Sequence, residues 1–391
     1  MSLKGAETLE PPNYRNSHPS RTISEKRFEK SPFEAFYNKR DIVFGIYNNR
    51  FYPLSINDDP IEAYWRLRKS VMLYDVPEKP LEISGVDSVS FLEKIFTRRL
   101  SDLKTMRARY MLACSHDGGL VMDGVLIRFS KHKFWYIHAN GNFESWLLAH
   151  KNNFDVSIRD PKSWALQIQG PKALLLLKKM VPGLRFENFK YFYAKKIRLD
   201  GTKYLISRTG WTGEKGFEIY TNGRTDQHEK LWQQIMSAGK ELDIKFGGLD
   251  SMGIRRIEAG ILDYGTDIDL RHNPFEVGLG RFVDLNNPQF IGNEALQRAN
   301  KSCRLVGIRC PDSIPFSGLS VVNGKKLVGE TTTGAYSPYF EEGIGFVMLR
   351  VRNWRDLNQL CLFGQDGKRY KCTLTSLPFY DREKKIPRGL Q

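Results

Sequence analysis

The stretch that most constrains the fold covers residues 207–220 and reads SRTGWTGEKGFEIY. Three glycines within seven residues predict a bent loop, and the alternating polar and apolar residues after it predict a strand. Glu218 lies between Phe217 and Ile219, so its side chain points to the opposite face from both. That face is either solvent, the commoner case, or a cavity in which the carboxylate would accept hydrogen bonds from a heterocycle.

A second informative stretch covers residues 110–124 and reads YMLACSHDGGLVMDG. The Asp-Gly-Gly at 117–119 predicts a hairpin between two apolar runs, and such a hairpin brings Tyr110 and Asp123 back towards each other. The apolar neighbours of Asp123 indicate that it is at least half-buried, where a carboxylate needs a partner or a cationic ligand. The competing interpretation is that Asp123 simply caps a turn.

Helices and strands alternate irregularly around these two stretches. Apolar spacings of three and four predict helices over residues 88–95, 226–242 and 250–262. Runs of aromatic and β-branched residues predict strands over 133–138, 165–168 and 204–207. On the third helix, Arg255 and Glu258 are spaced to form an ion pair.

The pattern changes near residue 300. Short strands separated by Gly, Pro and Asn turns are expected at 305–309, 326–329, 344–350 and 370–374. Such a succession is typical of a small all-β barrel or sandwich. We therefore predict an α+β fold in three parts: a disordered or loosely draped N-terminal arm over 1–27, an α+β region over 28–300 and an all-β domain over 301–385.

Composition narrows the class of protein. The 391 residues carry 60 Lys+Arg against 44 Asp+Glu, a formal net charge of +16, which favours an anionic partner or substrate. Apolar runs are far shorter than the ~20 residues that cross a bilayer, so we expect no membrane-spanning segment. We also expect no membrane partner. Five widely spaced cysteines without a CxxC pair indicate a reducing compartment, and we expect a cytoplasmic protein.

Familiar catalytic motifs are absent from the sequence. There is no GxxxxGK[ST], no GxGxxG after a strand, no HExxH and no GxSxG. The seven histidines are not clustered at metal-ligand spacings, so we expect no protein-bound metal. The candidate chemistry therefore rests on the carboxylates and aromatic residues of the stretches quoted above.

Three further motifs complete an ordered set. Residues 254–265 read IRRIEAGILDYG, residues 290–296 read FIGNEAL, and Ser337-Pro338 lies in the β-rich part. With the hairpin and the glycine-rich loop, they resemble the folate-dependent aminomethyltransferase family, whose founding member is the T-protein of the glycine cleavage system. The resemblance covers residues 30–380. It implies three lobes around a central channel for tetrahydrofolate, with two interleaved α+β lobes preceding the β-barrel.

Within that family, four stretches look closer to dimethylsulfoniopropionate demethylase than to the T-protein: residues 31–54, 209–211, 264–276 and 377–379. Trp211 stands where T-proteins have a tyrosine. Tyr380 and Asp381 precede Arg382, so it is open whether Arg382 replaces the arginine with which T-proteins contact folate. The KGCYxGQE signature of iron–sulfur-assembly and tRNA-modifying relatives is absent, so we expect no nucleic-acid partner.

The resemblance implies a folate-binding role for four residues. Glu218 would accept two hydrogen bonds from the pterin, a charge-assisted two-point contact. Trp211 would supply an aromatic wall. Arg256 and Tyr264 would position Glu218, the folate or its tail.

The resemblance also implies a catalytic pair, Asp123 and Tyr110, beside N5 of the folate. We expect a tetrahydrofolate-dependent methyltransferase (demethylase) that moves a methyl group from a small onium donor, such as dimethylsulfoniopropionate, to N5. Asp123 would receive the N5 proton. Aromatic side chains that would suit a cationic donor are Trp211, Tyr110, Tyr47 and Phe51.

Three alternatives stay open. A glycine-cleavage aminomethyltransferase would dock a lipoyl carrier protein and yield methylene-tetrahydrofolate and ammonia. An O- or N-demethylase would use the same scaffold for an aromatic or amine substrate. A folate- or RNA-binding module without catalysis is disfavoured, because a pure binder has no need of both Tyr110 and Asp123.

Overall fold

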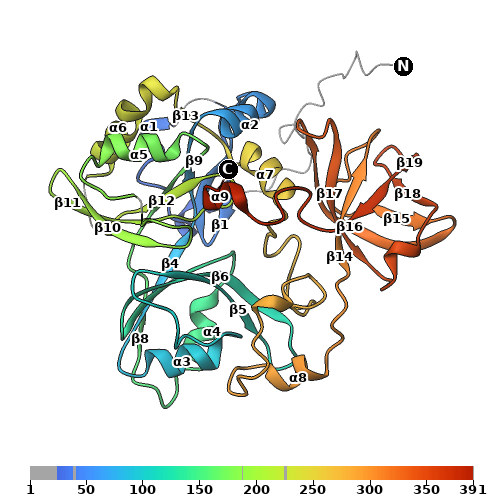
Figure 1. Ribbon diagram of the computed structural model, residues 1–391, viewed down its shortest axis with the longest axis horizontal. Helices are drawn as coiled ribbons and strands as arrows, with labels where there is room; N and C mark the ends of the chain where they lie inside the picture. The colour runs from blue at the N-terminus through green and yellow to red at the C-terminus, as the bar shows by residue number, and fades with distance from the viewer. Residues whose placement is uncertain (1–23, 38–40, 187, 224–226, 391) are drawn as a thin grey trace.

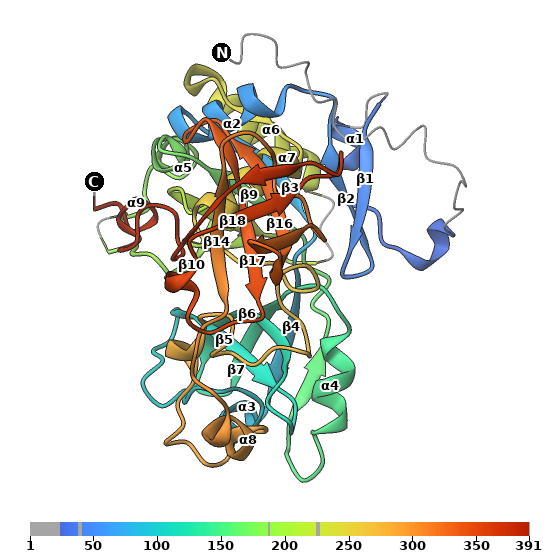
Figure 2. The same cartoon turned by 90° about the vertical axis from the view of Figure 1, so that its right-hand side faces the viewer.

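The computed structural model describes residues 24–37, 41–186, 188–223 and 227–390 (Figure 1). Of the arm predicted over residues 1–27, residues 1–23 lie outside the described residues. The described chain is arranged in three lobes, each built on one β-sheet (Figures 1 and 2). Within these ranges, every helix is too short or too polar to span a membrane.

The first lobe is a six-stranded sheet in the order β10-β11-β12-β9-β3-β13. Its strands are β3 (Met72–Val76), β9 (Ala165–Gln169), β10 (Ala194–Leu199), β11 (Thr202–Ser207), β12 (Gly216–Tyr220) and β13 (Lys245–Phe246). Helices α5 (Ala173–Met180) and α6 (His228–Gly239) lie against this sheet (Figure 1). Their apolar faces, including Leu177 and Ile235, are buried with Ile168 of the sheet in one core cluster.

The second lobe is a five-stranded sheet in the order β5-β6-β7-β4-β8. Its strands are β4 (Lys79–Ser84), β5 (Ala108–Cys114), β6 (Leu120–Ser130), β7 (Lys133–His138) and β8 (Ser157–Arg159). Helices α3 (Ser88–Ile95) and α4 (Phe143–Ala149) pack on it through Phe91, Leu147 and their neighbours. Because β3 and β9 belong to the first sheet, the chain leaves the first lobe after β3 and returns to it after β8.

The third lobe is an all-antiparallel, nearly closed β-barrel (Figure 2). Its order is β19-β18-β15-β16-β17-β14-β20. The strands are β14 (Leu305–Cys310), β15 (Ser320–Asn323), β16 (Lys326–Ser337), β17 (Glu342–Leu349), β18 (Leu360–Phe363), β19 (Arg369–Lys371) and β20 (Thr373–Thr375). Val321, Val347 and Leu362 are fully buried in its core.

The remaining elements connect the lobes. They are the hairpin of β1 (Val43–Tyr47) and β2 (Arg50–Ser55) and the helices α1 (Glu34–Tyr37), α2 (Pro60–Lys69), α7 (Leu249–Glu258), α8 (Asn293–Arg298) and α9 (Lys385–Arg388). Short 3-10 turns cover Glu25–Arg27, Lys240–Leu242, Gly280–Phe282 and Trp354–Asp356. The α7 helix packs on α2 and on β16 of the barrel, so it lies at the junction.

The structure confirms the α+β class and the all-β C-terminal module, and α3 and β7 have the predicted bounds. Other predicted bounds are wrong in detail. The helix predicted over 226–242 is α6 as far as Gly239 and then a 3-10 turn, and the strand predicted over 326–329 continues in β16 as far as Ser337. The helix predicted over 250–262 ends at Glu258, because Gly260 adopts a left-handed φ of 63°, a conformation that terminates helices. The strand predicted over 370–374 is two strands, since β19 pairs with β18 whereas β20 pairs with β14.

Glu258, the last residue of α7, joins the barrel to the rest of the molecule. It is fully buried and accepts hydrogen bonds from Tyr64 at 2.8 and 2.9 Å, Ser337 at 2.6 Å and Arg255 at 3.3 Å. Arg68 lies 3.5 Å away as a further ion-pair partner. The predicted Arg255–Glu258 pair is therefore present, and the Ser-Pro motif of the barrel binds to the end of α7.

Candidate active site

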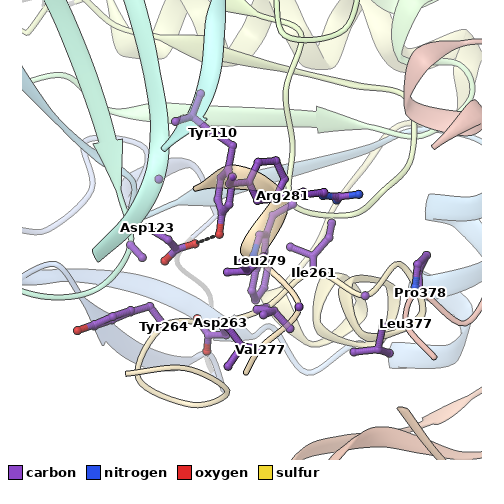
Figure 3. A pocket seen from close by; sticks show the side chains of 18 of the residues that line it. Tyr110, Asp123, Ile261, Asp263, Tyr264, Val277, Leu279, Arg281, Leu377 and Pro378 are labelled. Carbon is purple, nitrogen blue, oxygen red and sulfur yellow. Dashed lines mark hydrogen bonds between the residues drawn. The ribbon is translucent and has the colours of Figure 1, made fainter. Parts of the chain in front are cut away.

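A cavity of about 1100 Å³ lies where the three lobes meet. Its lining comes from β5, β6 and β7 of the second lobe, from β12 and the glycine-rich loop of the first, and from β14 of the barrel. The connections over 260–282 and 376–384 complete it, and Figure 3 shows side chains from these segments around one part of the cavity.

Tyr110 and Asp123 are brought together by the predicted hairpin. Leu112 lies opposite Asp123 and Tyr110 lies opposite Val125, so Tyr110 and Asp123 are diagonal neighbours on one face of the sheet. The Tyr110 hydroxyl donates a 2.7 Å hydrogen bond to Asp123 Oδ2 (Figure 3). The turn-cap interpretation of Asp123 is wrong, because the residue lies within β6 and lines the cavity.

The carboxyl of Asp123 is only partly engaged. Its Oδ1 is buried and has no hydrogen-bond partner among the described residues. Burial raises the pKa of Asp123 to about 6, the hydrogen bond from Tyr110 lowers it, and the charge of Asp263 raises it further. A buried carboxyl with one free oxygen and a pKa close to neutrality is a candidate proton acceptor.

Glu218 on β12 faces the cavity, so the solvent-facing interpretation is wrong. Its Oε2 accepts hydrogen bonds from Ser207 at 3.0 Å, Tyr220 at 2.8 Å and Thr209. Its Oε1 accepts one from Gln167 Nε2 at 2.8 Å. Burial raises the pKa of Glu218, and these four donors act in the opposite direction.

Glu78 is a second carboxylate in the lining that the sequence analysis missed. Its Oε1 accepts a 3.0 Å hydrogen bond from Gln167 Nε2, the nitrogen that also bonds Glu218. Burial, followed by the charge of Glu218, raises the pKa of Glu78 to about 8. The available signal was an acidic residue two positions after β3, beyond Pro77, where the chain leaves the first sheet.

Trp211 lines the cavity, whereas Arg256 does not. The guanidinium of Arg256 lies 5.1 Å from the centroid of the Trp211 ring. It donates hydrogen bonds to Asp267 and, at 3.0 Å, to Thr333. Arg256 therefore contacts the back of the aromatic wall and makes no hydrogen bond to Glu218.

Asp263 and Tyr264 follow α7 and line the cavity near Asp123 (Figure 3). Burial raises the pKa of both Asp123 and Tyr47, and the charge of Asp263 acts in the same direction. Asp263 was not among the predicted site residues, although it lies inside the 254–265 motif. Of the aromatic candidates for a cationic donor, Tyr47 also lines the cavity, but Phe51 packs against two other phenylalanines instead.

Cationic side chains also line the cavity, and they suit the anionic partner or substrate that the net charge favours. They are Arg98, Arg109, Arg281, Arg352, Arg355 and Lys384. Burial, followed by the charges of Arg255 and Arg281, lowers the pKa of Lys384 to about 8. Arg382 is exposed, donates a 2.9 Å hydrogen bond to Ser376 and is not part of the lining, so Lys384 is the C-terminal cation that reaches the cavity.

Metal-ligating side chains and thiols are the other candidates for reactive groups in the described ranges. These ranges contain no group of three or more His, Cys, Asp or Glu side chains placed to hold a metal ion. Cys114 is fully buried, and burial raises the pKa of its thiol to about 12, so it is not an activated nucleophile.

Comparisons with known proteins agree with this geometry. The family described as "GCVT N-terminal domain" matches residues 42–287, and "Glycine cleavage T-protein C-terminal barrel domain" matches residues 304–381. An aminomethyltransferase of Clostridium botulinum (strain Okra / Type B1) is 35% identical over 301 residues, which cover 74% of this chain and 80% of that protein. An aminomethyltransferase of Caldanaerobacter subterraneus subsp. tengcongensis is 31% identical over 337 residues, covering 83% and 89%.

One solved structure shares the whole architecture. The glycine cleavage system aminomethyltransferase T from Bartonella henselae superposes with a TM-score of 0.81 at 23% identity, over 91% of this chain and 99% of that one. Three lobes around a carboxylate-lined cavity, with these relatives, define a folate-dependent one-carbon transferase. The chain belongs to the glycine cleavage T-protein family. Its named relatives are aminomethyltransferases, so they favour that alternative over the demethylase we first expected.

Proposed function

We propose that this protein transfers a one-carbon unit to N5 of tetrahydrofolate, and that the unit is the aminomethyl group that glycine cleavage presents on a lipoyl carrier protein. The observation that carries the proposal is the Tyr110–Asp123 pair, in which one buried carboxylate oxygen has no partner among the described residues. The names of the relatives at 31–35% identity support the aminomethyl unit.

The lining of the cavity fits a folate. Glu78 and Glu218 are acceptors suited to the N–H donors of a pterin. The Trp211 ring offers a face for stacking on a flat heterocycle. The six cations of the lining suit the carboxylates of a glutamate tail. A volume of about 1100 Å³ accommodates such a ligand together with the one-carbon donor.

The chain's own residues supply alignment and a proton acceptor. Tetrahydrofolate, when bound, supplies N5 as the nucleophile. Tyr110 fixes the Asp123 carboxylate through Oδ2, which leaves Oδ1 free to take the proton from N5. Asp123 then returns this proton to the departing amine, which leaves as ammonia when the carbon–nitrogen bond of the aminomethyl group breaks and the bond from N5 to that carbon forms. The second bond to that carbon comes from N10, whose proton goes to the carrier sulfur, so the carbon–sulfur bond breaks and a thiol is left.

A second candidate is methyl transfer from a small onium donor, which would make the protein a demethylase. It is favoured by Tyr47, which comes from the 31–54 stretch and lines the cavity near the carboxylates of Asp123 and Asp263. An aromatic ring beside carboxylates suits a sulfonium, which is cationic and has no N–H to donate. In this reaction the methyl–sulfur bond breaks as the methyl–N5 bond forms, and Asp123 takes the N5 proton.

Product analysis distinguishes the two candidates. The full chain is incubated with tetrahydrofolate and, separately, with aminomethyl-lipoyl carrier protein, sulfonium, betaine and methoxyaromatic donors. We expect methylene-tetrahydrofolate and ammonia from the carrier protein. Formation of 5-methyltetrahydrofolate from a sulfonium alone would establish the demethylase instead. Its formation from a betaine or methoxyaromatic alone would establish the O- or N-demethylase alternative. The absence of turnover with every donor would contradict transferase activity.

A further inference from the structure

The Glu218 carboxylate has fewer free acceptor positions than a two-point contact requires. Each carboxylate oxygen has two lone pairs, so the group accepts about four hydrogen bonds. The hydroxyls of Thr209 and Tyr220 fill the two positions of Oε2, and the Ser207 hydroxyl lies within hydrogen-bond distance of both Oε2 and Thr209. Gln167 takes one position on Oε1. Within the described residues, Glu218 therefore offers a ligand one acceptor position, on Oε1.

Glu78 supplies the second acceptor position that Glu218 lacks. Its Oε2 is buried and has no hydrogen-bond partner in the described ranges. Both carboxylates bond to the same Gln167 nitrogen, at 2.8 and 3.0 Å, so the Gln167 amide holds them side by side. The Gln167 side chain is fully buried, which fixes this arrangement. The free acceptor positions are thus shared between two residues.

We propose that Glu78 and Glu218 bind the N–H edge of the pterin together, with Glu218 accepting from N3–H and Glu78 accepting from the 2-amino group. The inference rests on the proposed function and deepens it. The edge presents N3–H and two N–H bonds of the amine, more donors than the open position of Glu218 can satisfy. Glu78 is therefore a specificity-determining residue that selects ligands carrying a 2-amino group.

The arrangement also predicts proton release on binding. Near neutral pH, Glu78 holds a proton in the free protein, since burial and Glu218 raise its pKa to about 8. Accepting an N–H hydrogen bond favours the ionised form, so the ligand displaces that proton. The charged and titratable groups that face Glu78 are Glu218 and Tyr220 on β12, Asp75 on β3, Tyr47 on β1 and Arg50 on β2.

Calorimetric titration of the full chain tests the proposal, with tetrahydrofolate and its 2-desamino analogue as the two ligands. In Glu78→Gln, affinity for tetrahydrofolate should fall about ten- to a hundredfold, the range for a lost hydrogen bond to a charged group. Affinity for the analogue should stay the same in this variant. Proton release, measured from the dependence of the binding heat on the buffer, should disappear. Glu78→Ala, which removes the acceptor altogether, should behave in the same way.

Glu82→Gln is the matched control. Glu82 lies on the next strand, is also buried and bonds Trp135 and Arg159 outside the cavity, so both affinities should be unchanged. The inference would be overturned if both Glu78 variants lost affinity for the two ligands equally, or if Glu78→Ala kept the wild-type affinity for tetrahydrofolate. Either result would leave the proposed function standing. A wild-type chain that does not bind tetrahydrofolate would overturn the proposed function itself.

Discussion

Tyr110 occupies one carboxylate oxygen of Asp123 through a 2.7 Å hydrogen bond and leaves the other without a partner in the described chain. The Tyr110–Asp123 pair therefore provides both a fixed carboxylate and a free oxygen that can accept a proton. The hydrogen bond fixes the orientation of the carboxylate, and the free oxygen keeps its capacity to take a proton. Because both residues lie on paired strands, the geometry is held by the sheet and not by a loop.

Asp123→Asn should abolish most of the turnover and leave folate binding intact. The amide keeps an acceptor for Tyr110 but cannot take a proton, so we expect turnover to fall by about 10² to 10⁴. Stopped assays of product give the rate, and calorimetry gives the affinity. Asp117→Asn, at the exposed turn of the same hairpin, is the control. Near-wild-type turnover in Asp123→Asn would remove Asp123 from proton transfer.

Turnover should rise with pH through a midpoint of about 6, because Asp123 accepts a proton only when it is ionised. Tyr110→Phe should move this midpoint upwards, since the hydrogen bond from Tyr110 lowers the pKa of Asp123. The pH dependence of kcat/KM measures both midpoints, because it reports the ionisation of the protein without bound substrate. A midpoint that does not move in Tyr110→Phe would show that another group limits the rate.

Asp123→Asn should also stabilise the protein at high pH. The pKa of Asp123 is raised from 3.8 in an exposed chain to about 6 in the fold, so the folded state holds the proton more tightly. The stability that this proton contributes is complete below pH 4 and is lost as the pH rises through 6. We expect the variant to gain about 1–3 kcal/mol over wild type at pH 8 and nothing at pH 4. Urea denaturation at the two pH values measures the difference, and an equal gain at both would contradict the assignment.

The proximity of Tyr110 and Asp123 could be predicted from the sequence because it depends on local geometry. A Gly-Gly turn and two apolar runs suffice to place Tyr110 beside Asp123. Strand alternation likewise gave the face of Glu218, but it could not say whether solvent or protein covered that face. The roles of these residues and the domain limits at residues 27 and 300 stay predictions.

Glu78 and Asp263 could not be predicted in the same way. They line one cavity with Asp123 only because three lobes pack together, and that packing depends on contacts between residues far apart in the chain. The Ser337–Glu258 hydrogen bond is one such contact, across 79 positions. For Arg256 the motif predicted the position but not the direction of the side chain. The guanidinium contacts Asp267 and the Trp211 ring and does not line the cavity.

Glu258→Gln should weaken the attachment of the barrel and thus the stability of the whole fold. The buried carboxylate is bonded by Arg255 and Arg68, and neutralising it leaves their charge partly uncompensated. Removing one partner of a buried ion pair costs about 3–5 kcal/mol, and we expect the lower end because Glu214 still pairs with both arginines. Urea denaturation measures this loss. Glu294→Gln is the control, because its ion pair with Arg298 is exposed to solvent, where such pairs contribute little. If Glu258→Gln and the wild type unfolded at the same urea concentration, apolar packing alone would hold the barrel to α7.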